Sequence, residues 1–262
     1  MLILQNKGEN MKIGVIGLGL IGGSIFKDLI RLNYDVVAVS KSQNGKNIYK
    51  TYDVLKDRDL IFVCTPMNKT LVVLDELENF LPNTTVVTDV CSLKRFVSQK
   101  QYSYNFIPSH PMAGTEHKGF ENSFEGLFKG AKWVITKNID KNNILIKIIK
   151  QLGATPVYAT PEEHDKAAAL ISHMPMLVAQ AIFKTAQNNK LALEMASSGF
   201  RDMTRLALSN TEMANDMITM NSDNIEQSIL SLYKSIGELA QNDYLNQIEQ
   251  IKNKRKQMFY NF

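Results

Sequence analysis

The segment that decides the fold of this chain is Lys12-Ile13-Gly14-Val15-Ile16-Gly17-Leu18-Gly19-Leu20-Ile21-Gly22. Its first six residues are a short apolar run, which is the form of a strand buried in a parallel sheet. A glycine-rich turn follows, and a helix is expected from there to about Leu32. The segment therefore predicts a strand, a tight turn and a helix, the start of a βαβ unit.

The turn over residues 17–22 matches G-x-G-x-x-G, a pattern that is informative only between a strand and a helix, as here. Gly17 permits the tight turn, Gly19 lets a pyrophosphate approach the backbone, and Gly22 lets the helix pack closely on the strand. Free N–H groups at the start of the helix face the phosphates. We therefore predict that a dinucleotide binds at Gly17, Leu18, Gly19, Leu20, Ile21 and Gly22.

The alternation of strands and helices continues beyond this unit. Further strands are predicted over residues 35–40, 59–65, 85–90, 105–108, 132–136 and 155–159, with helices over 71–80 and 140–152. This alternation implies βαβ units and a parallel twisted sheet. We predict an α/β, Rossmann-like dinucleotide-binding domain over residues 11–160, and interpret residues 1–10 as a disordered extension without a structural role.

The pattern changes after Pro161, where strand-like runs cease. Helices are predicted over residues 167–186, 191–196, 203–208, 211–220 and 224–254. We therefore predict an all-α C-terminal domain over residues 161–262. An apolar helical array of this length beside a nucleotide-binding domain favours a homodimer formed through these helices. The alternative is that the helices pack only on their own chain.

The end of the second strand indicates which dinucleotide is bound. NAD-binding proteins place Asp or Glu there, on the ribose 2′-hydroxyl, whereas this chain has Ser40 and Lys41. The nearest acid, Asp35, lies about 16 Å away at the other end of the strand. A hydroxyl and an ammonium suit a 2′-phosphate, so we predict NADP; the alternative is that Lys41 is simply a surface lysine. Thr65 and Pro66, at the end of another strand, are added to the predicted cofactor site.

Composition and charge exclude several other classes of protein. Much of the net charge of +4 comes from a basic cluster over residues 252–256, which is more typical of a solvated helix end than of a nucleic-acid site. The two cysteines, Cys64 and Cys91, are too few for a disulfide framework or a zinc site, and fit a reducing compartment. The chain has no signal segment and no apolar run of about 20 residues. We expect a cytoplasmic protein without a metal and without a membrane or nucleic-acid partner.

A second informative segment is Ser109-His110-Pro111-Met112-Ala113-Gly114-Thr115-Glu116, which follows the strand over 105–108. It places a titratable side chain on a loop stiffened by a proline, at the edge where open α/β sheets keep their chemistry. If the turn at 17–22 binds a nicotinamide cofactor, His110 is the leading candidate for the group that moves a proton.

Three further segments contribute candidate residues. Ser92 follows a strand end and could hydrogen-bond a histidine or a substrate oxygen, or simply cap the next helix. His173 lies in a helix beside Pro175, whose missing N–H is expected to kink it; His173 either lines a site or packs in the core. Arg201 and Arg205 lie between two helices, where they form a structural salt bridge or a clamp for carboxylates.

Six segments along the chain carry a resemblance to a known family when they are taken in order. They are Gly17-Leu18-Gly19-Leu20-Ile21-Gly22-Gly23-Ser24, Thr88-Asp89-Val90-Cys91-Ser92-Leu93-Lys94, His110-Pro111-Met112-Ala113-Gly114-Thr115-Glu116, Glu163-His164-Asp165, Ser172-His173-Met174-Pro175 and Gly199-Phe200-Arg201-Asp202-Met203-Thr204-Arg205. Together they resemble the prephenate/arogenate dehydrogenase family of tyrosine biosynthesis, over nearly the whole chain from Met11. The compact length and the end of the second strand at Ser40 and Lys41 most resemble the short, NADP-using arogenate dehydrogenases of cyanobacterial type.

The resemblance implies an oxidoreductase acting on arogenate or prephenate, with NADP as cofactor. Hydride leaves C4 of the cyclohexadienyl ring, the 4-hydroxyl loses its proton, and CO2 departs as the ring becomes aromatic. By this resemblance His110 is the catalytic histidine, Ser92 orients it, His173 lines the substrate site, Arg205 holds a substrate carboxylate and Arg201 supports that loop. An intertwined homodimer with its active site in the interdomain cleft is also implied.

Two positions depart from the family pattern, and two other functions stay open. Met176 stands where many prephenate-using members have a second histidine, which favours arogenate, and Ser109 replaces the usual glycine. One alternative is another NADP-dependent oxidoreductase, of the β-hydroxyacid dehydrogenase or pyrroline-carboxylate reductase type, which typically has no histidine on this loop. The other is a non-catalytic NADP-sensing protein, which would have no need of His110, His173 and Arg205 together.

Overall fold

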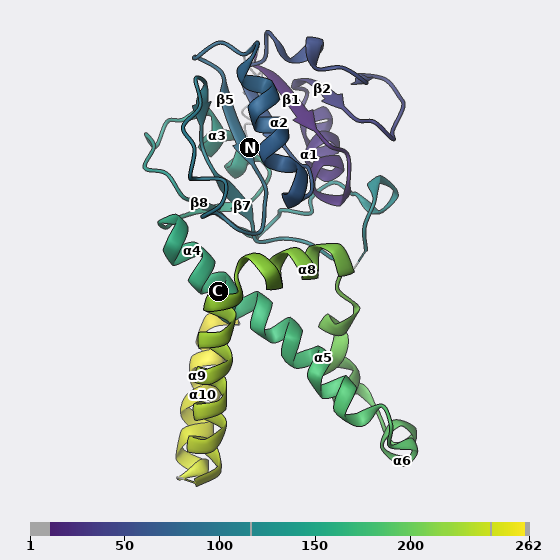
Figure 1. Ribbon diagram of the computed structural model, residues 1–262, viewed down its shortest axis with the longest axis vertical. Helices are drawn as coiled ribbons and strands as arrows, with labels where there is room; N and C mark the ends of the chain where they lie inside the picture. Colours follow the sequence, from purple (N-terminus) through teal and green to yellow (C-terminus); the bar gives the residue numbers. More distant parts are fainter. Residues whose placement is uncertain (1–10, 116, 242, 260–262) are drawn as a thin grey trace, which may run out of the picture.

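The computed structural model describes residues 11–115, 117–241 and 243–259. Residues 1–10, for which we predict an extension, lie outside the described part of the chain. Figure 1 shows an α/β domain with helices extending away from it on one side. The boundary predicted near residue 160 falls between the last strand, β9 (Thr155–Tyr158), and helix α4 (Pro161–Ala168). The predicted fold class, an α/β domain followed by an all-α domain, is confirmed.

The larger sheet contains the predicted strand–turn–helix unit. Its six strands are all parallel and lie in the order β3-β2-β1-β4-β5-β6. They are β1 (Lys12–Ile16), β2 (Asp35–Val39), β3 (Ile48–Tyr49), β4 (Leu60–Val63), β5 (Val86–Asp89) and β6 (Asn105–Phe106). β1 lies between β2 and β4, so the strand order reverses there, and the carboxyl ends of these strands form the expected place for a ligand.

Two helices follow the central strands of this sheet. α1 (Leu20–Arg31) follows β1 as predicted, and α2 (Met67–Glu78) follows β4, four residues before the predicted start at 71. Every residue of β4 and β5 is buried, which explains their apolar sequence up to the polar end of β5 at Thr88 and Asp89. Short 3-10 helices at Tyr52–Leu55 and Phe120–Asn122 complete the connections.

A second, three-stranded sheet departs from the single parallel sheet that we predict. It consists of β7 (Ser109–Pro111), β8 (Lys132–Ile135) and β9, and α3 (Ile144–Gln151) connects the last two. β7 pairs antiparallel with β8, so His110 lies in a strand and not in a loop. The indole N–H of Trp133 in β8 donates to the Ser109 hydroxyl over 2.9 Å. A glycine at 109 could not accept this hydrogen bond, so Ser109 helps to fix β7.

The described chain after β9 contains only helices. They are α4, a π-helical turn at Ala169–His173, α5 (Met174–Ala186), α6 (Lys190–Glu194), α7 (Ser198–Thr204), a 3-10 helix at Arg205–Leu208, α8 (Thr211–Met220), α9 (Ser222–Gln241) and α10 (Tyr244–Phe259). The single helix predicted over 224–254 is therefore two helices. Figure 1 shows α5 leading to α6 on one arm, and α9 with α10 on a second arm that diverges from the first.

The first helix of this region is continuous but not uniform. It begins with a capping box, in which the Thr160 hydroxyl accepts from the Glu163 N–H and the Glu163 carboxylate accepts from the Thr160 N–H. It widens into the π-helical turn just before Pro175, where the missing proline N–H interrupts the α-helical ladder. The interruption predicted at Pro175 thus takes the form of a widened turn that ends at His173.

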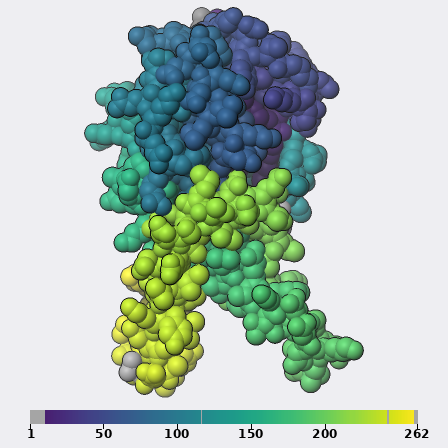
Figure 2. Space-filling view, viewed as in Figure 1, coloured from purple at the N-terminus to yellow at the C-terminus, as the bar shows by residue number. Residues whose placement is uncertain are grey.

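The two arms project from the α/β domain (Figure 2), and many of their large apolar side chains are exposed in the single chain. Examples on α9 are Ile229, Tyr233 and Ile236, which are 42%, 76% and 56% exposed. The continuous helix Pro161–Ala186 is long and apolar enough to cross a bilayer by length and composition, and 28% of its most apolar window is buried. Polar residues such as His164, Asp165 and His173 interrupt its apolar sequence, so the helix contains no uninterrupted apolar run of that length.

Candidate active site

The glycine turn has the shape that a dinucleotide requires. Gly17 has a φ of +89°, and a Cβ there would lie 2.6 Å from the carbonyl oxygen of Cys64. A Cβ on Gly22 would lie 2.0 Å from the carbonyl oxygen of Gly17. Gly19, the N-cap of α1, faces open space, with no described atom beyond its chain neighbours within 4 Å of a Cβ position. The turn itself requires Gly17 and Gly22, whereas Gly19 leaves room for a ligand at the helix N-terminus.

The loop after β2 presents hydroxyl and ammonium groups. The Ser40 hydroxyl accepts from the N–H of Gln43 over 3.1 Å, and Lys41 is exposed. The Lys50 ammonium donates to the carbonyls of Ser40, Lys41 and Gln43 at 3.1, 3.2 and 2.6 Å. Asp35, at the opposite end of β2, pairs with Arg58 over 3.0 Å. The carboxylate of β2 is therefore far from residues 40–43, where it would repel a 2′-phosphate.

Thr65 and Pro66, which are predicted cofactor residues, follow β4 beside the glycine turn. A Cβ on Gly17 would come within 3.4 Å of the Thr65 backbone nitrogen. Pro66 is the N-cap of α2, and the Thr65 hydroxyl lies 3.0 Å from that of Thr70. The carboxyl end of β4 thus forms one wall of the expected cofactor site.

A fully buried ion pair fixes the strand that carries His110. Lys94 pairs with Asp89 at the end of β5, and both side chains are fully buried. The Lys94 ammonium also donates to the Ser109 carbonyl over 2.7 Å. Asp89 accepts in turn from the N–H groups of Cys91 and Ser109, at 2.9 and 3.2 Å. Through Ser109, the residue before His110, this cluster holds β7 against the loop that follows β5.

His110 is hydrogen-bonded to a second histidine from the helical domain. Its Nδ1 lies 2.9 Å from Nε2 of His164 on α4, and His164 Nδ1 lies 2.8 Å from a carboxylate oxygen of Asp165. Burial, followed by the charges of His164, Lys94 and His173, lowers the pKa of His110 well below its usual value of 6.5. His110 is therefore neutral near pH 7, with an imidazole able to accept a proton.

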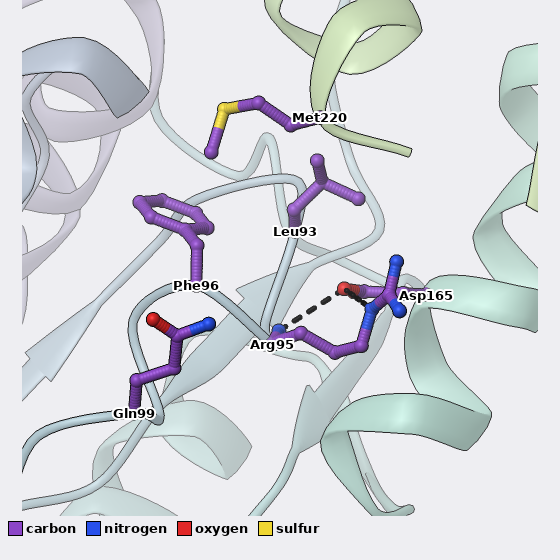
Figure 3. Close-up of a pocket in the computed structure, with 6 residues that line it drawn as sticks. All are labelled: Leu93, Arg95, Phe96, Gln99, Asp165 and Met220. Atoms are coloured by element: carbon purple, nitrogen blue, oxygen red, sulfur yellow. Dashed lines mark hydrogen bonds and ion pairs between the residues drawn. The ribbon is translucent and has the colours of Figure 1, made fainter. Parts of the chain in front are cut away.

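Asp165 joins this pair of histidines to the α/β domain. Its carboxylate accepts from the backbone N–H of Lys94 over 2.7 Å and of Arg95 over 3.0 Å. Figure 3 shows Arg95 and Asp165 together at the edge of a pocket of about 280 Å³ that also includes Met220. Burial acts to raise the pKa of Asp165, but the hydrogen bonds from His164, Arg95 and Lys94 outweigh it and lower the pKa.

His173 lies in the same cluster and has its own partner. The side-chain amide nitrogen of Asn221 lies 3.2 Å from His173 Nδ1, and 2.8 Å from the backbone carbonyl oxygen of Asp165. His173 is 1% exposed, and burial lowers its pKa to about 4 although the charge of Asp165 acts to raise it. His173 is thus both a packed residue and a neighbour of His110, so the two readings of this residue are compatible.

Ser92, Arg201 and Arg205 make no hydrogen bond to this histidine cluster in the described part of the chain. No hydrogen bond joins Ser92 to His110 in the described part of the chain, and the orienting role that the resemblance implies for Ser92 stays a prediction. Arg205 begins the 3-10 helix Arg205–Leu208, which packs on α5, and its side chain is exposed. Arg201 is exposed and lies 3.5 Å from Asp202. The structure therefore gathers His110 and His173 but leaves both arginines outside the cluster of this chain.

Sequence reasoning missed four residues of this site: Lys94, His164, Asp165 and Asn221. Three of them stand in segments that carry the family resemblance, but their roles depend on contacts between distant segments. Lys94 follows Asp89 by five residues, a spacing that could have suggested an ion pair across a turn. Within residues 11–115, 117–241 and 243–259 no group of three or more His, Cys, Asp or Glu is placed to hold a metal ion.

Two family models match consecutive parts of the chain. The nucleotide-binding domain of prephenate dehydrogenase matches residues 35–158, and the dimerization domain of prephenate dehydrogenase matches residues 160–257. Together the two matches cover well over half of the chain, and they meet at the junction between β9 and α4.

Individual relatives agree with these matches. Prephenate dehydrogenase of Bacillus subtilis is 30% identical over 246 residues, which is 80% of this chain but only 64% of that protein's length. Arogenate dehydrogenase of Synechocystis superposes with a TM-score of 0.80 at 31% identity, covering 95% of this chain and 100% of the other. Prephenate dehydrogenase of Aquifex aeolicus, with hydroxyphenyl propionate and NAD+, shares the fold with a TM-score of 0.81 at 24% identity, covering 95% and 99%. With its glycine turn, its histidine cluster and these matches, the chain belongs to the prephenate dehydrogenase family.

Proposed function

We propose that this chain catalyses the NADP-dependent oxidative decarboxylation of arogenate, or of prephenate, in tyrosine biosynthesis. The observation that carries the proposal is the neutral His110, held by His164 and Asp165 beside the carboxyl edge of a dinucleotide-binding sheet. A sensor of NADP would need the glycine turn but would have no use for a proton acceptor fixed in this way. Family membership also favours this activity over that of a β-hydroxyacid dehydrogenase.

The reaction needs a base at one atom of the substrate. As the C4–H bond breaks, the 4-hydroxyl becomes a carbonyl, and its proton passes to the free ring nitrogen of His110. The ring carboxylate then leaves as CO2, its bonding electrons pass through the ring to the oxygen at C4, and that oxygen takes the proton back from His110 as the ring becomes aromatic. A nicotinamide bound at the glycine turn supplies the hydride acceptor. For this step His110 must be neutral and within reach of the hydroxyl. Burial and the neighbouring charges favour the neutral form because they lower the pKa of His110.

The loop after β2 supports NADP over NAD. Ser40 and Lys41 stand where an acid would bind the ribose 2′-hydroxyl, and the nearest acid of the strand, Asp35, is paired with Arg58. Lys50 donates to three backbone carbonyls of the loop, whereas Lys41 is exposed and follows Ser40 directly, which suits it to a 2′-phosphate. The known cofactor of a relative does not decide the matter, since the Aquifex aeolicus protein holds NAD+.

The substrate proposed first is arogenate. Met176, where many prephenate-using members have a histidine, is 3% exposed and packs with Leu93 and Met217 between the domains. No imidazole therefore stands there for a keto acid side chain. On the family pattern Arg205 holds a substrate carboxylate, with Ser92 and Arg201 in supporting roles.

The apolar arms support a homodimer. The helical region has only a small buried apolar cluster, which it shares with Met67, Cys91 and Leu93 of the α/β domain. Most of its large apolar side chains are exposed in the single chain, including those of Leu191, Met203 and Tyr233. A second copy packed along both arms would bury this surface, and the dimerization-domain match points the same way. The cytoplasmic location stays a prediction from the sequence.

One assay tests the activity directly. Absorbance at 340 nm is followed with arogenate and with prephenate, each with NAD and with NADP. We expect the highest kcat/KM for arogenate with NADP, and no turnover above background for His110→Asn with unchanged NADP binding. Higher kcat/KM with prephenate or NAD would revise the specificity alone. No turnover with any of the four pairs would remove the proposed function.

A further inference from the structure

The hydrogen bonds around His110 indicate which of its ring nitrogens carries the proton, as well as where the ring lies. The chain of contacts runs from Asp165 to His164 and then to His110, at 2.8 and 2.9 Å. Each imidazole has two nitrogens that differ in role when the ring is neutral, since one donates and the other accepts. The proton of each ring can therefore be assigned by starting from a group whose role is known.

Asp165 is that group. Two backbone N–H groups, of Lys94 and Arg95, donate to its two carboxylate oxygens over 2.7 and 3.0 Å. A carboxylate that accepts at both oxygens is ionised and cannot itself donate to His164. His164 must therefore donate from Nδ1, so its Nε2 carries a lone pair if the ring is neutral.

The same reasoning passes to His110. With a neutral His164, Nε2 accepts, so His110 donates from Nδ1, which leaves the lone pair on His110 Nε2. We propose that His164 and Asp165 are positioning residues that hold His110 in the Nδ1–H tautomer, so that Nε2 is the base. This inference deepens the proposed function and rests on it for its catalytic meaning.

His173 provides an internal contrast within the same cluster. The Asn221 atom 2.8 Å from the backbone carbonyl of Asp165 must be the amide nitrogen, because a carbonyl only accepts. That nitrogen also lies 3.2 Å from His173 Nδ1, so this Nδ1 accepts and the proton of His173 is on Nε2. The two histidines are thus held in opposite tautomers: His110 offers an acceptor at Nε2, and His173 offers a donor.

Nuclear magnetic resonance of the full chain tests the assignment without turnover. The protein contains four histidines, so a long-range ¹H–¹⁵N spectrum of [¹⁵N]histidine-labelled protein distinguishes their tautomers. Single substitutions assign the four ring systems. We expect the proton on Nδ1 in His110 and His164, and on Nε2 in His173. A wild-type His110 with its proton on Nε2, or with both nitrogens protonated, would overturn the inference.

Substitutions then test the cause. In His164→Leu, which has no acceptor, we expect His110 to change to the Nε2–H form and kcat to fall about 10²-fold with KM within a few-fold. His164→Gln, whose amide oxygen can accept from His110, should recover part of both. Glu163→Gln is the matched control, since the Glu163 side chain accepts from the Thr160 N–H in the capping box and glutamine can replace it there. An unchanged His110 tautomer in a folded His164→Leu protein contradicts the positioning role.

The two readouts separate this inference from the proposed function. The expected tautomers without any dehydrogenase activity would remove the proposed function and keep the network. Dehydrogenase activity with His110 in the other tautomer would do the reverse. If His164→Leu fails to fold, the wild-type spectrum still decides.

Discussion

Gly22 lies so close to Gly17 that a Cβ on Gly22 would stand 2.0 Å from the Gly17 carbonyl oxygen. This distance separates two kinds of glycine in one motif. Gly17 and Gly22 are needed for the turn to exist, whereas a Cβ on Gly19 would meet no described atom within 4 Å except its chain neighbours. Gly17 and Gly22 are thus required by the fold, whereas Gly19 keeps space free for a ligand.

Alanine at Gly22 should therefore lower stability, whereas alanine at Gly19 should weaken dinucleotide binding. Gly22→Ala forces the turn apart and should lower the free energy of unfolding by about 1–3 kcal/mol or more. Gly19→Ala should leave thermal stability unchanged but raise the Kd for the dinucleotide about tenfold or more, because the new methyl group occupies the approach of the pyrophosphate. Thermal melts and calorimetric titration with NADP measure the two effects. Loss of stability in Gly19→Ala would show that the open space is filled by the protein itself.

The buried pair of Lys94 and Asp89 should be essential to stability. Lys94→Met leaves a buried carboxylate without its partner, which typically costs about 3–5 kcal/mol. Urea unfolding followed by the fluorescence of Trp133, the single tryptophan of the chain, measures the loss. Adding Asp89→Asn removes the unpaired charge and should restore part of the stability. A Lys94→Met protein as stable as the wild type would contradict the role of this pair.

Activity should persist at mildly acidic pH. His110 must be unprotonated to accept the hydroxyl proton, and burial with neighbouring positive charge lowers its pKa well below 6.5. Activity is then lost only as the pH falls through that lowered value, so kcat/KM at pH 6 should remain near its value at pH 7. The measurement is a pH profile of kcat/KM for arogenate. An acidic limb centred at or above pH 6.5 would mean that the ring is more solvated than in this structure.

The cofactor preference should change with one residue at the end of β2. Ser40→Asp keeps an acceptor for the Gln43 N–H, so the loop should retain its shape. Its carboxylate would repel a 2′-phosphate and accept from a ribose hydroxyl, which should move the preference from NADP towards NAD. The ratio of kcat/KM for the two cofactors measures the change. Ser40→Asn adds a similar volume without the charge and serves as control; an unaltered ratio in Ser40→Asp would place the ribose elsewhere.

Arg205 should affect substrate binding more than the chemical step. If it holds a substrate carboxylate, Arg205→Ala should raise KM about 10²-fold, since a charge-assisted contact contributes about 2–3 kcal/mol. Arg205→Lys keeps the charge without the planar fork and should fall between the two. Steady-state kinetics with saturating cofactor gives both parameters. A wild-type KM in Arg205→Ala would leave this exposed side chain without a role in binding.

Some features of this protein follow from sequence alone because they are local. The strand–turn–helix unit at residues 12–32 needs only apolar residues, three glycines and their spacing, and the predicted α1 agrees with the structure to within a residue or so. Ser40, Lys41 and Asp35 could be placed at opposite ends of β2 because a strand has a fixed rise per residue. His110 could be singled out because its segment follows a strand end and carries a recognisable pattern.

The tertiary structure alone decided what surrounds His110. His164 is 54 residues away in sequence from His110, and Asn221 is 48 residues from His173, so no local pattern could pair them. The antiparallel pairing of β7 with β8 likewise joins segments that periodicity cannot relate, which is why a loop was predicted there. Sequence determined which side chains are available and on which edge of the sheet they lie. Only the packing of the helical domain against that edge determined which nitrogen of His110 is free to take a proton.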